Sequence, residues 1–263
     1  MTAGTRHSVH FRQVELDLLA THAGVPVPFP LQVPSFGRFA GERDALLAEA
    51  GQALCDRGLA TEHEPIGLAA ELVTALCAHR SAIDLVLLGA DTVTGVVALV
   101  YEGSALVCRQ EFGDERAGTV QVGRILADEL ADEFGELIPD VRAATTMPIT
   151  LPPGVVDAAR LLGTTSGQPA SREHVADLVR EHRGEDVVDQ LGTLIPAVTG
   201  RGQLGVVRRS GATVDRPFEA SWLDSPRGRV EVSTGEHGWM SVNSLRRNEI
   251  VRLVQEAVSL ARA

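Results

Sequence analysis

The sequence lacks a long apolar run. No stretch of about 18 apolar residues occurs in the 263-residue chain, although 44% of the residues are hydrophobic, so no transmembrane helix is predicted. The N-terminal segment Met1–Arg12 also lacks the hydrophobic core of a signal peptide. These absences predict a cytoplasmic protein that has no membrane partner.

Cysteine is scarce and lysine is absent. The three cysteines, Cys55, Cys77 and Cys108, are widely spaced and set in apolar runs. Their odd number and their surroundings predict small buried side chains in a reducing compartment, not a disulfide framework or a metal site. All 24 basic residues are arginines, which indicates the compositional bias of a GC-rich genome.

Basic residues are fewer than acidic ones. The formal net charge is −11 at pH 7. Because phosphate binding needs a basic surface, this charge argues against a nucleic-acid partner. The basic pairs Arg208-Arg209 and Arg246-Arg247 make the C-terminal part of the chain less acidic than the average.

Motifs of catalysis and cofactor binding are missing. The sequence has no G-x-S-x-G, no H-E-x-x-H and no P-loop, and its eight histidines never fall two or four apart with a carboxylate in register. The letters Gly200-x-Gly202-x-x-Gly205 match a dinucleotide-binding motif. They follow a predicted helix and open a predicted strand, which reverses the context that the motif requires. No cofactor, metal or small-molecule substrate is predicted.

What the sequence does contain is a series of strands between Gln203 and Val242. Alternating large and small or polar side chains predict strands at 203–209, 218–223, 229–233 and 238–242. Their connections are short, so the strands are expected to be antiparallel. An amphipathic helix is predicted from Leu245 onward.

The same order of elements occurs about 121 positions earlier. Strands are predicted at 82–88, 94–101, 105–110 and 119–123, and a helix at Arg124–Leu137 with Leu126, Leu130 and Phe134 facing inward. The repetition predicts a mixed α+β fold with a mostly antiparallel central sheet. A single domain is expected, built of two similar halves, about 1–138 and 139–263, that are related by an approximate twofold.

Each half begins with helices. In the first half a strand is predicted at 8–11 and helices at 14–22, 41–57 and 67–79; in the second half helices are predicted at 155–162, 172–183 and 185–195. The proline-rich stretch Val25–Pro34 cannot be a helix or an interior strand. It is expected to cross the surface with its apolar side chains held against the core.

Two of the strands have no polar face. Leu85–Leu88 and Val96–Val100 are apolar at every position. Both of their faces must be covered, by helices, by the other half of the chain or by a partner.

A turn is predicted at Asp224-Ser225-Pro226-Arg227-Gly228. Asp224 is expected to cap backbone amides, Pro226 to fix φ and Gly228 to accept a positive φ before Arg229 opens the next strand. The alternative is an enzyme site in which Asp224, Arg227, Arg229 and His237 share a polar pocket. The structural role in a turn is favoured because turns require these residue types.

Several of these segments resemble the EspG family, the chaperones of ESX (type VII) secretion in actinobacteria. The segments Val14–Leu19 and Val25–Leu31 are similar to the start of that family, and Glu42–Leu47 with Asp56–Leu59 to its second segment. The closing turn Leu223–Arg229 and the strand Gly238–Val242 resemble its C-terminal signature. The resemblance spans nearly the whole chain in the right order.

The resemblance implies a fold and a function. The implied fold is a pseudo-twofold one, with a mostly antiparallel sheet flanked by two helical bundles. The implied function is that of a cytoplasmic, non-enzymatic chaperone that binds the hydrophobic tip of PPE-type (PE/PPE-like) substrates and keeps them soluble. A regulatory module for a non-secreted partner and an enzyme with a site near Asp224, Arg227 and Arg229 remain as alternatives.

A partner surface is predicted at two places. The connection Gly89-Ala90-Asp91-Thr92 leaves the most apolar strands and has small residues that let another backbone come close. The second place is the apolar stripe on the helices of the second half, at Leu178, Val179, Val187 and Val188. Together they are expected to form the groove for a client.

Overall fold

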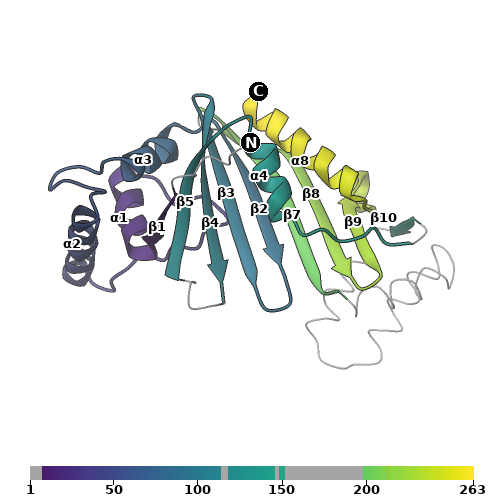
Figure 1. The fold of residues 1–263 in the computed structure, drawn as a ribbon, viewed down its shortest axis with the longest axis horizontal. Helices are drawn as coiled ribbons and strands as arrows, with labels where there is room; N and C mark the ends of the chain where they lie inside the picture. The colour runs from purple at the N-terminus through teal and green to yellow at the C-terminus, as the bar shows by residue number, and fades with distance from the viewer. Residues whose placement is uncertain (1–7, 114–117, 146–147, 152–197, 212) are drawn as a thin grey trace, which may run out of the picture. The chain divides into compact units, whose positions relative to one another are not determined.

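The computed structural model describes residues 8–113, 118–145, 148–151, 198–211 and 213–263. Its strands are hydrogen-bonded in the order β1-β5-β4-β3-β2-β7-β8-β9-β10-β6 (Figure 1). The strands are β1 (Ser8–Arg12), β2 (Ser81–Leu88), β3 (Val93–Tyr101), β4 (Ser104–Phe112), β5 (Thr119–Leu126), β6 (Ile149–Leu151), β7 (Gly200–Ser210), β8 (Thr213–Ser225), β9 (Gly228–Thr234) and β10 (Met240–Ser244). The α-helices are α1 (Gln13–Ala23), α2 (Ala40–Asp56), α3 (Leu68–Ala78), α4 (Leu130–Leu137) and α8 (Arg247–Arg262). None of the helices described is long and apolar enough to cross a membrane.

The strand order is the same in both halves of the chain. Reading outward from the neighbours β2 and β7, each half runs through four successive strands, and a strand from earlier in that half closes the edge. That strand is β1 beside β5 in the first half and β6 beside β10 in the second, both antiparallel. The predicted α+β fold with duplicated strand order is confirmed, and we propose that the chain is one domain of two similar halves, 1–138 and 139–263. The helices predicted at 155–195 lie outside the described residues.

The chain packs as two compact units. The first comprises residues 1–138, 203–219 and 251–263, and the second comprises 139–202 and 220–250. The strands β7 and β8 and the helix α8 therefore each contribute residues to both units.

The first unit has a core between its sheet and the helices α1, α2 and α3. Leu16 and Leu19 of α1, Leu54 of α2 and Leu72 of α3 pack in one cluster with buried side chains of β1, β3, β4 and β5. Val97 and Leu99 of β3 belong to this cluster, and both are fully buried. Their neighbours Val96 and Ala98 point to the opposite face of the strand and are buried as well. Both faces of β3 are covered, as its apolar sequence predicted.

The ends of α1 and α2 follow from two glycines. Gly24 and Gly58 have φ of +67° and +69°, the left-handed conformation that glycine adopts without strain. After α2 the Gly58 amide donates to the Cys55 carbonyl and the Leu59 amide to the Leu54 carbonyl, which is the Schellman arrangement. Both helix ends lie where the sequence predicted them.

The helix predicted from Arg124 begins later, at Leu130. Ile125 and Leu126 instead extend β5, where they pair with Ala105 and Ser104 of β4. Leu126 is 54% exposed, so its predicted inward position is wrong, whereas Leu130 and Phe134 are fully buried as expected. Pairing with β4 overrides the helical periodicity, because local propensity is weaker than a ladder of backbone hydrogen bonds.

The proline-rich crossing is held on the sheet by one buried side chain. Gln110 of β4, which is 0% exposed, accepts a hydrogen bond from the backbone amide of Gln32 (2.8 Å) and donates one to its carbonyl (3.0 Å). Pro30 lies over Gly95 of β3, where a Cβ atom would come within 3.1 Å of the proline ring. Phe29 departs from the prediction, since it is 60% exposed and not held against the core.

An ion pair fixes the end of that crossing. Both terminal nitrogens of the Arg43 guanidinium donate to the Asp17 carboxylate (2.7 and 2.9 Å), and the Phe36 amide donates to it as well (3.0 Å). Burial alone raises the pKa of Asp17, but these hydrogen bonds and the charge of Arg43 outweigh it, so the net pKa is below the ordinary 3.8.

Asp17→Asn is expected to flatten the loss of stability in acid. Because the pKa of Asp17 is lower in the folded state, its carboxylate stabilises the fold above pH 3.8, and this contribution is lost as the pH falls toward the folded-state pKa. Urea unfolding between pH 2 and pH 6 measures the slope of the free energy of unfolding against pH. Glu49→Gln, at an exposed position of α2, serves as the charge-matched control and should keep the wild-type slope. An unchanged slope in Asp17→Asn would contradict the assignment.

The glycines of the motif at 200–205 make room for side chains of β8. A Cβ at Gly202 would lie 2.0 Å from the ring of Trp222, and one at Gly205 would lie 2.1 Å from the guanidinium of Arg216. Arg216 in turn donates two hydrogen bonds to the buried carboxylate of Asp84 (2.8 and 3.1 Å). Burial raises the pKa of Asp84 although Arg216 opposes the shift. The motif lies within a strand and serves packing.

Candidate partner-binding site

The connection between β2 and β3 is a short, fully exposed loop. Leu88 and Val93 close the strand ladder, and the Gly89 amide donates to the Thr92 carbonyl at 2.8 Å. The four loop residues, Gly89, Ala90, Asp91 and Thr92, are all exposed. Behind the loop, the ends of the two strands are half-buried or exposed, and full burial begins at Leu85 and Gly95.

Two large apolar side chains are exposed toward this end of the sheet. Leu88, the last residue of β2, is 40% exposed. Pro30 contacts Gly95, two residues into β3, which places the exposed Phe29 at the same end of the sheet. We call Phe29, Leu88 and the loop Gly89–Thr92 the hairpin patch. Large apolar side chains left exposed beside a loop are typical of a surface that contacts another protein.

The second predicted surface falls outside the described residues. Leu178, Val179, Val187 and Val188 all lie between residues 152 and 197, which the structure does not describe. The groove expected between the hairpin patch and these residues is therefore a proposal.

The closing turn differs in detail from its prediction. Asp224 does not cap backbone amides: its carboxylate accepts hydrogen bonds from Nε (2.6 Å) and Nη2 (2.8 Å) of Arg229. The amide-capping role belongs to Ser225, whose Oγ accepts from the Arg227 amide and donates to the Gly228 carbonyl. Gly228 has φ of +120°, as the turn required. Asp224 was misassigned because sequence spacing does not show that Arg229 points back across the turn.

Among the described residues of the second unit, Arg229 is the most buried charged one. Its side chain is 0% exposed, and its guanidinium lies over the ring of Trp222, 5.5 Å from the centroid. Its backbone joins two other segments, because its carbonyl accepts from the amides of Ala144 and Leu245. Arg229 therefore contacts the turn, the ring of Trp222 and the residues that lead into α8.

The alternative enzyme site is not assembled. Asp224 and Arg229 pair with each other inside the fold, and Arg227 is exposed on the turn. His237 lies beyond the other end of β9, in the short 3-10 turn at 236–238, where its φ is +61°. Among the described residues no group of three His, Cys, Asp or Glu side chains is placed to hold a metal.

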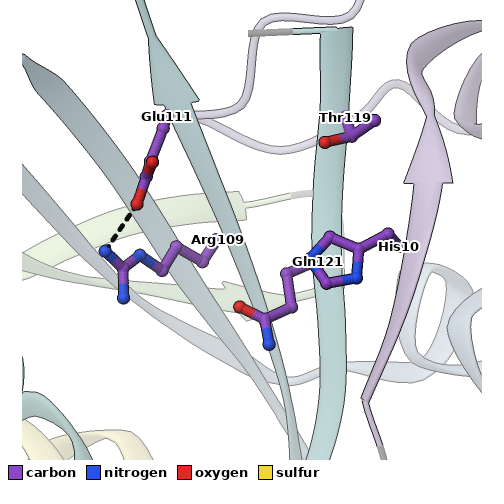
Figure 2. Close-up of a pocket in the computed structure, with 5 residues that line it drawn as sticks. All are labelled: His10, Arg109, Glu111, Thr119 and Gln121. Carbon is purple, nitrogen blue, oxygen red and sulfur yellow. Dashed lines mark hydrogen bonds and ion pairs between the residues drawn. The ribbon is translucent and has the colours of Figure 1, made fainter. Parts of the chain in front are cut away.

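A polar cavity on β1, β4 and β5 is a weaker candidate. Figure 2 shows that it is lined by His10, Arg109, Glu111, Thr119 and Gln121, with an ion pair of 2.7 Å between Arg109 and Glu111. Its volume is about 50 Å³, which has room for a few waters and not for a metabolite. These side chains form the solvated face of the sheet edge.

Sequence reasoning missed two features of the first unit. Phe29 is exposed, whereas its proline-rich segment was predicted to hold its apolar side chains against the core. The buried pair of Asp84 and Arg216 joins residues 132 positions apart, and no local pattern reveals it. A charged residue interrupting an otherwise apolar strand was the one available signal for Asp84, since buried carboxylates need a partner.

The fold and the hairpin patch define an α+β protein that presents an exposed loop at one end of an antiparallel sheet whose strand β3 is buried on both faces. The model of the EspG family matches residues 13–256, and the chain therefore belongs to the EspG family. No curated protein matches the sequence.

Among solved structures, the chain is similar to EspG5, a type VII secretion system chaperone of Mycobacterium tuberculosis, in complex with a PE25–PPE41 dimer. The TM-score is 0.64, and the match covers 97% of this chain and 96% of that one. The identity is 11%, so the likeness concerns the fold.

Proposed function

We propose that this chain is a cytoplasmic, non-enzymatic chaperone that binds the hydrophobic tip of PPE-type proteins and keeps them soluble for type VII secretion. Membership of the EspG family over residues 13–256 carries the proposal. The shared fold with EspG5, whose structure contains a PE25–PPE41 dimer, supports it. In this proposal the chain acts by binding alone.

The hairpin patch is the part of the proposed client groove that has described residues. Ala90 is exposed at the loop tip, and Leu88 (40%) and Phe29 (60%) expose apolar surface beside it. Burying such surface against the apolar tip of a client helix supplies association energy without needing directed contacts. The groove is proposed to continue onto Leu178, Val179, Val187 and Val188.

Co-expression with PPE-type proteins and their PE partners, followed by pull-down, tests the function itself. Capture of a soluble PE–PPE pair by the wild-type chain is the expected result. Capture of no member of the panel would contradict the proposal. Capture of a protein without PE or PPE character would favour the regulatory module instead.

Ala90→Arg is expected to weaken client binding about a hundredfold. A charge at the loop tip would have to be desolvated against the client, which costs about 3 kcal/mol. The melting temperature should not change, because the tip is exposed. Biolayer interferometry against the captured client measures the affinity.

Val214→Arg is the matched control. Val214 is 63% exposed on β8 and lies at the opposite end of the sheet, since the Arg209 amide beside it donates to the carbonyl of Arg80 at the start of β2. This variant adds the same charge and should bind as wild type. If Ala90→Arg folds and retains full affinity, the groove lies elsewhere on the chain.

A further inference from the structure

A cavity of about 800 Å³ lies in the first unit, at the end of the sheet opposite the hairpin patch. It is lined by Ser81 at the start of β2, Tyr101 at the end of β3 and the last residues of α8. The eight residues of β2 place it about 25 Å from the loop at 89–92. A client bound at the loop would leave this cavity open.

Four arginines line this cavity: Arg80, Arg208, Arg209 and Arg262. The chain as a whole is acidic, with a net charge of −11, so four arginines around one cavity stand against the average composition. Within the described part of the chain, none of the four guanidinium groups takes part in an ion pair or a side-chain hydrogen bond. By contrast, Arg43, Arg57, Arg216 and Arg229 all pair with buried or half-buried carboxylates.

The arginines make the charge around the cavity positive, and two carboxylates partly offset it. Glu102 and Asp215 also line it. The helix α8 ends there with its partially negative carbonyl end, and Arg262 in its last turn offsets that dipole. The positive potential reaches His79, whose pKa is lowered by burial and further by the charge of Arg209. Because Glu102 and Asp215 offset part of the positive charge, a ligand with a single negative charge would gain little electrostatic binding energy. A ligand with several negative charges can interact with all four arginines at once.

We propose that this arginine cavity binds a small polyanion that carries two or more phosphate groups. Arginine forks match phosphate oxygens in pairs, and phosphate places more than one charge on a single group. The volume is within the range of small-molecule pockets. The net charge of −11 opposes a long nucleic acid, so the ligand is a small molecule.

The single tyrosine of the chain, Tyr101, gives a site-specific reporter on the cavity wall. Protein labelled with 3-fluorotyrosine therefore gives one ¹⁹F signal, which can be followed during titration with inorganic tripolyphosphate. A saturable shift that weakens with added salt is expected. The absence of any shift at concentrations on the order of 1 mM would overturn the proposal.

The double variant Arg80→Gln/Arg208→Gln is expected to bind tripolyphosphate at least about tenfold more weakly. The double variant Arg38→Gln/Arg252→Gln removes the same charge from exposed arginines outside the cavity and should bind as wild type. Equal losses in both variants would overturn the proposal in favour of long-range electrostatics. Arg262→Gln, at the exposed end of α8, provides a second test if the first variant does not fold.

Tetraglutamate titrated into the same labelled protein distinguishes the ligand chemistry. Weaker binding than tripolyphosphate is expected, because carboxylates carry one charge each. Tighter binding would overturn the phosphate assignment and identify an acidic peptide as the occupant. None of these outcomes depends on client binding, so the cavity and the proposed chaperone function can fail separately.

Discussion

Asp224→Ala is expected to lower the free energy of unfolding by about 3–5 kcal/mol. The substitution removes the carboxylate that pairs with Arg229, whose side chain is 0% exposed. The guanidinium would then remain buried against Trp222 without its counter-charge. Urea unfolding followed by tryptophan fluorescence measures the change, because Trp222 lies in the affected cluster.

The loss expected from this structure exceeds the roughly 1 kcal/mol that one turn hydrogen bond would contribute. Arg227→Ala, on the same turn but exposed, serves as the control and should change stability by less than about 0.5 kcal/mol. The double variant Asp224→Ala/Arg229→Met replaces the ion pair by an apolar side chain and should regain much of the loss. A loss near 1 kcal/mol in the single variant would show that the ion pair is not the cause.

Gly228→Ala is expected to cost about 3 kcal/mol or more. Two effects combine at this residue, since its φ of +120° is strained for any L-residue and an added Cβ would lie 2.5 Å from the backbone nitrogen of Ala144. Ala144 cannot yield easily, because its amide donates to the carbonyl of Arg229.

Gly103→Ala separates the two effects. Gly103 also has a positive φ, +75°, but an added Cβ there would meet nothing within 4 Å. This variant should lose only the backbone term, about 1–2 kcal/mol. Equal losses at the two glycines, measured by thermal unfolding, would show that the approach of Ala144 to the turn has no energetic consequence.

Much of the fold could be predicted from local patterns. Alternation at 218–223 and 229–233 gave the strands, because a strand with one buried face must alternate. Gly24 and Gly58 marked helix ends, because few other residues adopt the left-handed conformation without strain. The repeat in element order gave the duplicated strand order, since each local unit forms the same meander.

The candidate site could be predicted only in part. The loop at 89–92 was chosen because it joins the most apolar strands of the chain, and its role in binding stays a prediction. The exposure of Phe29 was not predictable, because whether an apolar side chain in a crossing segment finds a place in the core depends on where Pro30 meets Gly95. The arginine cavity brings together residues from the start of β2, the end of β7 and the end of α8.

The sequence by itself determined the class of the fold, the glycines that end α1 and α2, the place of the closing turn and the burial of both faces of β3. These follow from interactions between residues close in the chain, where spacing fixes which side chains share a face. Only the tertiary structure decided the partners of the charged residues: Arg216 with Asp84, Arg229 with Asp224, and Arg80 and Arg208 with none in the described chain. The physical reason is that an ion pair depends on the register of strands and on the space left by glycines such as Gly205, which no single segment specifies.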